Sequence, residues 1–171
     1  MDQYKKQLND LTTLLKKQKL ETFLGYDVDF NGYLPPQKHE LVYSILFKLD
    51  LEILEPFYTV CDGISLPDIW NGYFIHTIFQ ISKNQQYNLS QSQNMSIIVF
   101  GSDGGGGQFA ISKVGEIYYL PVGEIIGKEY RGKHRLVANS FLSFIDKLVC
   151  DAKAFLLDQR PHVYLDGLSS R

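Results

Sequence analysis

The chain has 171 residues and a formal net charge of −2, which is the size of one ordinary domain. Its composition, 44% hydrophobic and 21% charged, is typical of a globular protein and excludes a disordered or fibrous chain. Because Lys and Arg are not in excess, we do not expect the protein to bind nucleic acid by neutralising phosphates.

The N-terminal segment predicts an amphipathic helix over residues 2–23. Leu8, Leu11 and Leu15 recur at helical spacing, with Lys and Gln on the opposite face. The segment lacks the apolar stretch of a secretory signal, and no run along the chain reaches the ~18 apolar residues that span a bilayer. We therefore expect a cytoplasmic protein that does not enter a membrane.

Helical spacing resumes after a polar turn region. Pro35 and Pro36 suit the first turn of a helix, where a missing N–H costs nothing. Leu41, Ile45 and Leu49 then recur at the spacing of one helical face. The sequence predicts a helix that begins at the two prolines and carries these three residues as an apolar stripe, with Leu46 beside it.

A second helical piece is expected directly after the first. Asp50 is a suitable N-cap for it, and Pro56 is expected early in a turn or at a kink. Asp62 and Gly63 are expected to close it, with the glycine in a left-handed conformation.

The middle of the chain predicts a sheet. β-Branched, aromatic or continuously apolar runs lie between turn residues at 64–66, 73–81, 96–101, 107–112 and 115–121. Lys113, Val114 and Gly115 are expected to form a tight hairpin between the last two strands. Two stretches are expected to lie outside the sheet: 82–94 as a loop or a short exposed helix, and 122–136 as a loop.

The chain predicts one more helix near its end. Asn139 or Ser140 can cap it, and Phe141, Leu148 and Ala152 form its apolar stripe. Residues 159–171 have weak periodicity and are expected to fray. We expect one domain over residues 1–171, of the α+β class, with N-terminal helices, a central and mainly antiparallel sheet, and a C-terminal helix packed on that sheet.

The run Gly101-Ser102-Asp103-Gly104-Gly105-Gly106-Gly107 is the feature most suggestive of chemistry. A phosphate-binding loop would need a Lys-Ser or Lys-Thr pair and a helix after it, whereas an apolar strand follows here. We therefore expect a tight connection between two strands, ordered by Asp103 accepting backbone N–H groups.

Other site signatures are not present in the sequence. His39, His76, His134 and His162 are scattered, and no pair of them has metal-ligand spacing, so no metal or cofactor is predicted. A histidine in a strand, such as His76, is more often solvated or hydrogen-bonded than part of a pocket. The two cysteines, Cys61 and Cys150, are expected to be reduced and mostly buried.

The acidic residues of the turns leave a second chemistry open. They could meet in space as a general acid and base, although solvated turn positions are the commoner role. The residues are Asp62, Asp68, Asp103 and Glu116.

The single tryptophan, Trp70, has two readings. Flanked by a proline, an Asn-Gly pair and Tyr73, it can be a surface anchor for a partner protein. It can equally fill the core.

Several segments occur together in a recognisable order. They are LPP at 34–36, FYTVCDGISLPD at 57–68, GSDGGGGQFAI at 101–111 followed by GEIYYLP at 115–121, and SFLSFIDKL at 140–148. In their order and spacing they resemble the SUKH superfamily, which also includes fungal cell-wall-assembly regulators, and the resemblance covers about residues 34–150. The chain departs from the family pattern at Gly107 and Gln108, where the family often has an acidic or aromatic residue, and in the long polar stretch 82–94.

This resemblance implies the same α+β fold and a bacterial immunity role. Members of the superfamily look like antitoxins that bind and neutralise a cognate polymorphic toxin, often a nuclease, and they have no established catalytic residues. The matching positions Asp103, Gly104, Gly105 and Gly106 are then fold-specifying. The expected contacts with the toxin are Asp68, Trp70, Tyr73 and Tyr87, and the protein is expected to be a monomer or a homodimer.

Two alternatives remain open at the level of sequence. One is an enzyme or small-ligand binder with a pocket between the sheet and a helix, for which His76 or Asp103 would be a pocket residue. The other is an intracellular regulatory scaffold, as the fungal relatives suggest. If the partner is a nuclease, a locally acidic face is expected.

Overall fold

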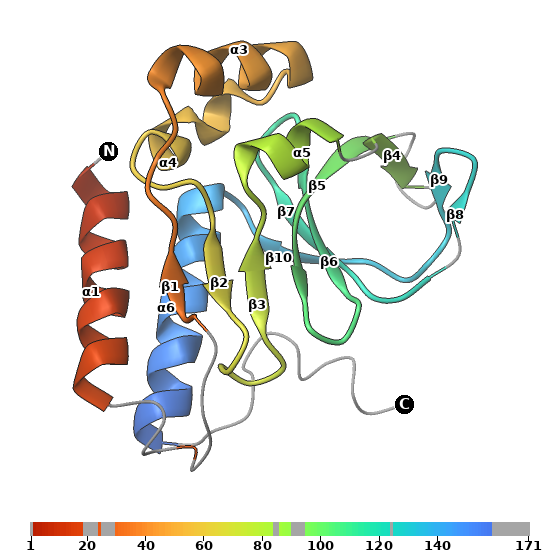
Figure 1. Cartoon of the computed structure of the whole chain (residues 1–171). Helices are drawn as coiled ribbons and strands as arrows, with labels where there is room; N and C mark the ends of the chain where they lie inside the picture. Colours follow the sequence, from red (N-terminus) through yellow and green to blue (C-terminus); the bar gives the residue numbers. More distant parts are fainter. Residues whose placement is uncertain are drawn as a thin grey trace.

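The computed structural model describes residues 2–18, 24, 30–83, 86–89, 95–123 and 125–158 (Figure 1). It has the expected α+β architecture, in which an N-terminal and a C-terminal helix pack on a mainly antiparallel sheet. Within the described residues, no helix is both long and apolar enough to cross a membrane. The expected terminal tail, 159–171, and residues 19–23 of the expected first helix lie outside the described residues.

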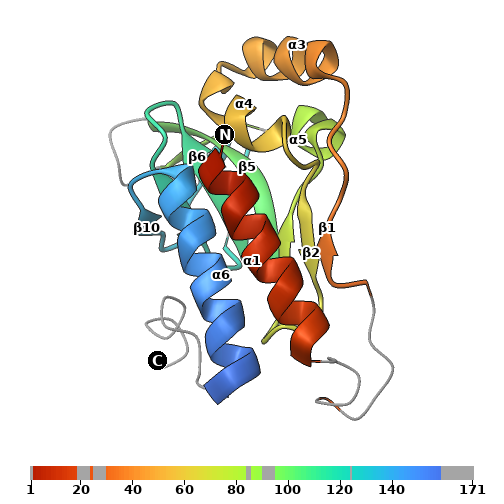
Figure 2. The ribbon, with the colours of Figure 1, turned by 90° about the vertical axis from the view of Figure 1, so that its left-hand side faces the viewer.

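The helices form two groups. Two long helices lie side by side on one face of the sheet, and short helices gather at one end of it (Figure 2). The long helices are α1 (Asp2–Gln18) and α6 (Phe141–Asp158). The short ones are α3 (His39–Leu49), the 3-10 turn η1 (Glu52–Leu54), α4 (Glu55–Tyr58) and α5 (Ile78–Lys83).

The strands are short apart from one. They are β1 (Gly32–Tyr33), β2 (Ile64–Leu66), β3 (Tyr73–Ile75), β4 (Gln86–Leu89), β5 (Met95–Asp103), β6 (Gln108–Ser112), β7 (Ile117–Leu120), β8 (Ile125–Ile126), β9 (Glu129–Tyr130) and β10 (Arg135–Ala138). The expected strand at 64–66 and the expected meander of β5, β6 and β7 are confirmed. In the hairpin between β6 and β7, the Gly115 N–H donates to the Ser112 carbonyl over 3.0 Å.

The long strand β5 is the centre of the sheet. Along one edge it pairs with β6, which continues to β7 and β10. Along its other edge it pairs with β4 in its first half and with β3 in its second half. The path therefore runs β1-β2-β3-β5-β4-β9-β8, and β4–β9 is the parallel pair.

Both faces of this central region are covered. On one face, Phe100 and Phe109 lie against Phe144 of α6, with ring centroids 5.4 and 5.0 Å from it. On the other face, a second apolar cluster forms where β4 and β9 curl over β5, β6 and β7. Its buried members are Leu89, Ile97, Val99, Ala110, Tyr118, Leu120 and Tyr130. A strand buried on both faces reads as a continuous apolar run, as the sequence of β5 predicted.

The expected helix after the prolines begins later than predicted. Pro35 and Pro36 lie before α3, whose N-cap is the extended residue Lys38. The fully buried side chains are Val42 and Leu46, while the expected stripe of Leu41, Ile45 and Leu49 is only half-buried. The buried face of the helix is therefore shifted from the expected stripe towards Leu46, which the sequence placed beside it.

Asp50 has a different role from the one predicted. It ends α3 instead of starting a new helix: its φ is +57°, and its N–H donates to the carbonyls of Leu46 and Phe47. Asp tolerates this left-handed conformation better than most side chains. Pro56 lies in the first turn of α4, and Gly63 has the expected positive φ.

The expected strand 73–81 is wrong in its second half. The strand ends at Ile75, and α5 begins at Ile78. Thr77 and Gln80 form a reciprocal capping box, since the Gln80 N–H donates to Thr77 Oγ1 and the Thr77 N–H to Gln80 Oε1. The Ile78 N–H also donates to the buried Asp62 carboxylate over 2.8 Å. These bonds favour a helix over continuation of the β-branched run.

Both stretches expected outside the sheet contribute strands. The stretch 82–94 supplies β4, and 122–136 supplies the β8–β9 hairpin and the start of β10. Tyr130 explains the second case: it is 2% exposed, and its hydroxyl donates to the Pro121 carbonyl over 2.6 Å. At the C-terminal helix the Ser143 N–H donates to Ser140 Oγ, so the expected cap is Ser140.

Candidate functional site

Two turns are joined at the end of the sheet opposite α3 (Figure 1). One connects β2 to β3 and the other is the glycine turn between β5 and β6. The Gly104 N–H donates to the Asn71 carbonyl over 2.8 Å, and a Cβ added at Gly104 would lie 2.0 Å from that oxygen. Glycine at 104 is therefore required for the two turns to approach. We call Pro67–Gly72, Gly104–Gly107 and Val122 the loop end.

Asp103 fills the inside of the glycine turn. Its Oδ1 accepts the N–H groups of Gly105 and Gly107 over 2.9 and 2.8 Å, and its Oδ2 accepts the Tyr119 hydroxyl over 2.7 Å. Burial, and then this bond to Asp103, raise the pKa of Tyr119 well above its ordinary value. The expected ordering of the turn by Asp103 is confirmed, and a protein carboxylate occupies the amides that a phosphate would need.

Trp70 and Tyr73 are both fastened to α6. The Trp70 indole N–H donates to the Asp151 carbonyl over 3.3 Å, and its ring makes an edge contact with Phe155 at 4.8 Å. The Tyr73 hydroxyl donates to the Asp151 carboxylate. Trp70 is half-buried with a φ of +53°, a conformation that costs a non-glycine residue free energy.

This arrangement corrects one of the expected contacts and favours one reading of another. Tyr73 is 0% exposed, so it is wrong as a surface contact and is a core residue. Trp70 packs against the core from the turn, which favours the core reading over that of a free surface anchor.

The other two expected contacts lie apart from each other. Asp68 is at the loop end, where the Asn31 side-chain amide donates to its carboxylate over 2.7 Å. Tyr87 lies on β4, half-buried against the second apolar cluster. The structure thus brings Asp68 and Trp70 into one turn and leaves Tyr87 in a different part of the sheet.

The side chains most available at the loop end are ones that the sequence did not single out. Val122 is 78% exposed and lies next to Gly106, and Asn71 is also exposed. The sequence signal for Val122 is an apolar residue inside a Pro-Val-Gly turn, since a turn residue without a packing role is free to face solvent and to contact a partner. Asn71 had no comparable signal beyond its Asn-Gly turn.

The acidic residues considered as an acid–base pair are separated. Asp103 lies at the glycine turn, whereas Asp62 lies at the other end of β3 and accepts Gln37 Nε2 and the Ile78 N–H. Glu116 follows the β6–β7 hairpin and accepts the Tyr118 hydroxyl. Each of these carboxylates, Asp68 included, therefore accepts hydrogen bonds at its own place in the fold, apart from the others.

The histidines are also spread over the fold. His39 pairs with Glu55, and His134 contacts the ring of Tyr118. His76 is half-buried at the end of β3, where burial lowers its pKa. His162 lies outside the described residues. Among the residues that the structure describes, no group of three or more His, Cys, Asp or Glu could hold a metal ion.

The cysteines do not share one environment. Cys61 is buried, and burial raises the pKa of its thiol to about 12. Cys150 is exposed on α6, so the expectation of two buried thiols is wrong for this residue. It borders a groove of about 380 Å³ between α1 and α6, which Leu14 and Val149 also line. This groove lies between two helices. A second groove, also of about 380 Å³, lies between α1 and β1, which is the kind of position that the small-ligand alternative expected, but neither His76 nor Asp103 lines it.

Comparison of the chain with protein-family models, with curated proteins and with solved structures gives no match.

Proposed function

We propose that the protein is a non-enzymatic immunity protein that binds a cognate toxin at the loop end and neutralises it by steric occlusion. The toxin assignment comes from the resemblance of the sequence to the SUKH superfamily. The single structural observation that supports binding at this place is the direct hydrogen bond between the two turns, Gly104 N–H to Asn71 O. Loops that a rigid scaffold holds together are where proteins most often present contacts to a partner.

The supporting argument is one of preorganisation. Asp103 fixes the glycine turn from within, and Trp70 fixes the neighbouring turn to α6. A partner that binds these turns would pay little conformational entropy to order them, so a small contact area can still give useful affinity. The strained φ of Trp70 fits this view, because strain of this kind concentrates at functional sites.

The use of the carboxylates supports binding over catalysis. Asp62 and Asp103 are buried, and each accepts at least two hydrogen bonds from neighbouring backbone or side-chain groups. A general acid or base needs a carboxylate that can exchange a proton with a substrate. These two carboxylates hold a helix start and a turn instead.

The proposal is tested with the polypeptide encoded next to the gene of this chain. That polypeptide is expressed in cells with and without the chain, and growth is measured. We expect it to be toxic alone, growth to be rescued by the chain, and the two purified proteins to form a complex by calorimetry. A neighbouring polypeptide that is harmless, or one that the chain does not bind, contradicts the proposal.

Two exposed valines supply a matched pair of variants. Val122 and Val114 lie beyond opposite ends of β7 and are 78% and 74% exposed. Val122→Arg places a large charge at the loop end, and we expect it to weaken toxin binding by about tenfold or more. Val114→Arg makes the same change at the other end and should leave binding unaltered. Equal effects of the two variants would contradict binding at the loop end.

A further inference from the structure

The outward face of α3 carries an ordered set of side chains. Its inward face is anchored by the buried Val42 and Leu46. The opposite face is exposed, and its residues recur at i, i+3, i+4, i+7 and i+8, the spacing of a helix–helix contact. These residues are Glu40, Tyr43, Ser44, Phe47 and Lys48, which we call the α3 stripe.

The centre of the α3 stripe is aromatic and exposed. Tyr43 is 46% and Phe47 62% exposed, and their rings stack on each other with centroids 5.9 Å apart. Large apolar side chains that gather on a surface mark interaction sites. The stripe is therefore a place where a partner would bury apolar area.

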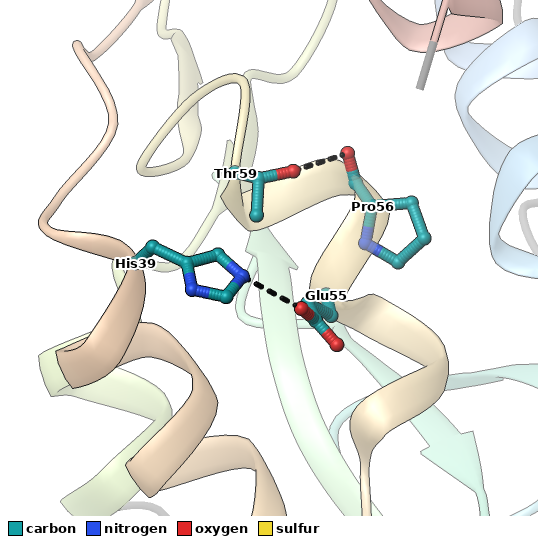
Figure 3. Close-up of polar contacts among 4 residues, drawn as sticks. All are labelled: His39, Glu55, Pro56 and Thr59. Atoms are coloured by element: carbon teal, nitrogen blue, oxygen red, sulfur yellow. Dashed lines mark hydrogen bonds and ion pairs between the residues drawn. The ribbon is translucent and has the colours of Figure 1, made fainter.

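Polar side-chain contacts lie at both ends of α3. His39 Nε2 lies 2.8 Å from Glu55 Oε1 near its start (Figure 3), and Lys113 Nζ lies 2.6 Å from Asp50 Oδ2 just after its end. In the same region the Thr59 hydroxyl, just after α4, donates to the Pro56 carbonyl of that helix. Because Val42 and Leu46 anchor the helix in the core, a partner would meet a preorganised helix, which lowers the entropic cost of binding.

The charges of the α3 stripe are arranged to complement a second copy of themselves. Glu40 and Lys48 lie four residues on either side of Ser44, and Tyr43 and Phe47 lie two residues on either side of Ile45. These two midpoints are one residue apart, about 1.5 Å along a helix axis. A single two-fold axis can therefore serve both pairs.

We propose that a second copy of this chain docks on the α3 stripe, with the two α3 helices antiparallel across a two-fold axis. Glu40 of each copy then faces Lys48 of the other, and Tyr43 of each copy packs on Phe47 of the other. Such an interface is isologous, the type that closed dimers use. Ser44 lies near the axis, where a small side chain allows the helices to approach closely.

The short length of α3 limits the contact area of the dimer. α3 has 11 residues, and a helix of that length spans about 16 Å. Contacts of this size fall among the smaller interfaces, so we expect a dissociation constant of about 10 μM.

This proposal is independent of toxin binding. α3 and the loop end lie at opposite ends of the molecule in Figure 1, so a dimer through α3 leaves the loop end accessible in both copies. Loss of one interaction would not by itself remove the other.

The first experiment is sedimentation of the purified chain from about 1 to about 300 μM. The proposal expects the mass to rise from 19.6 kDa towards twice that value over this range. A mass that stays at 19.6 kDa overturns it.

Charge reversal then tests the antiparallel pairing. Glu40→Lys and Lys48→Glu each place like charges opposite one another at two symmetric contacts, and each should weaken the dimer about tenfold or more. A mixture of the two single variants has opposite charges at both contacts, so we expect it to form a heterodimer within about twofold of the wild-type affinity. The double variant E40K/K48E should recover the homodimer in the same way.

The double variant also separates this pairing from a role within one helix. An acidic first turn and a basic last turn suit the helix macrodipole, so reversing both charges opposes the dipole most strongly in the double variant. If the charges served only α3 itself, the double variant would be the least stable and would not dimerise. Recovery of the dimer in the double variant supports the proposal, and absence of recovery overturns it.

Controls keep the fold and the net charge matched. Asp10→Lys and Lys6→Glu make the same charge changes at exposed positions of α1 and should leave dimerisation unchanged. Phe47→Ala removes the more exposed of the two rings of the α3 stripe and should weaken the dimer about 100-fold. A dimer that persists in Phe47→Ala, or a monomer in which α3 variants weaken toxin binding instead, overturns the proposal.

Discussion

The Tyr119 hydroxyl donates a hydrogen bond of 2.7 Å to Asp103 Oδ2, and this bond ties the glycine turn between β5 and β6 to the next strand, β7. Both side chains are buried, at 8% and 6% exposure. The other oxygen of the same carboxylate already accepts the Gly105 and Gly107 N–H groups. The Asp103 carboxylate thus connects the backbone of the glycine turn to a side chain of the sheet.

We expect substitution of either partner to destabilise the protein. Asp103→Ala leaves two amides and a hydroxyl without their acceptor in a buried place, which should cost about 3 kcal/mol of unfolding free energy. Tyr119→Phe loses one bond to a carboxylate and should cost about 1.5 kcal/mol. Urea unfolding measures both values.

Tyr118→Phe is the matched control for this pair. Tyr118 is on the same strand and its hydroxyl also donates to a carboxylate, that of Glu116, but Glu116 is only half-buried. Water can replace that bond, so we expect a cost of about 0.5 kcal/mol. Equal losses in Tyr118→Phe and Tyr119→Phe would show that the bond to Asp103 has no special weight.

We expect alkaline pH to destabilise the protein, because two buried groups, the Cys61 thiol and the Tyr58 hydroxyl, resist ionisation in the folded state. Burial raises the pKa of Cys61 from 9.0 to about 12, and burial together with Cys61 and Asp62 raises the pKa of Tyr58 well above 10.0. A raised pKa favours the protonated form in the folded state. The stability it contributes is complete below the unfolded pKa and is lost as pH rises from about 9 towards the folded pKa.

The slope of unfolding free energy against pH measures this effect. Between about pH 9 and 12, one such thiol should lower stability by about 1.4 kcal/mol per pH unit. Cys61→Ala removes that group, and its slope should be smaller by the same amount, whatever its packing costs at neutral pH. An unchanged slope in Cys61→Ala would contradict the assignment to this thiol.

The cap of α5 gives a third prediction. Thr77→Ala removes the side-chain acceptor of the Gln80 N–H and should cost about 1 kcal/mol. Thr59→Ala removes a hydroxyl that donates to Pro56 at an exposed position, so its cost should be within about 0.5 kcal/mol. Thermal unfolding of the two variants compares them directly, and a Thr77→Ala variant as stable as the wild type would contradict the capping role.

This cap also shows why part of the fold was mispredicted. The sequence YFIHTIF is β-branched and aromatic, and that local preference outweighed the Thr77-x-x-Gln80 capping signal three residues apart. The signal was present in the sequence. The bond from Ile78 N–H to Asp62, which completes the helix start, joins residues 16 apart and no local pattern predicts it.

The central strands could be predicted because burial on both faces of the sheet requires an apolar side chain at nearly every position. In the run Ser96–Gly101 this requirement is visible in the sequence as a continuous apolar stretch. The pairing of β4 with β9 is different, since it depends on a curl of the sheet that buries Tyr130. No periodicity in the stretch 122–136 predicts that curl of the sheet.

The candidate site divides in the same way. Asp103 accepts N–H groups two and four residues ahead, and a turn of this composition predicts such bonds. The burial of Tyr73 depends on Asp151, 78 residues away, so a surface role could not be rejected from the sequence. Asn71 meets Gly104 only because β3 and β5 are neighbours in the sheet.

The last prediction compares two glycines with positive φ. Gly63 has a φ of +107°, and a Cβ added there would lie 2.5 Å from the Ile75 carbonyl oxygen. Gly127 has a φ of +62°, with nothing within 4 Å of its added Cβ. Gly127→Ala therefore incurs only the backbone cost of a left-handed residue, about 1 kcal/mol. Gly63→Ala adds a collision with backbone between β2 and β3 and should cost about 3 kcal/mol or more.

Denaturant midpoints of the two variants test this difference, since both replace a glycine by an alanine. Gly127, at +62°, lies in the left-handed region that alanine can occupy, whereas Gly63, at +107°, lies outside it, so backbone conformation and lack of space both oppose alanine at Gly63. Equal losses in the two variants would contradict this prediction. A larger loss at Gly63 is the result expected where the chain approaches Ile75 closely, and the same approach places the Asp62 carboxylate at the start of α5.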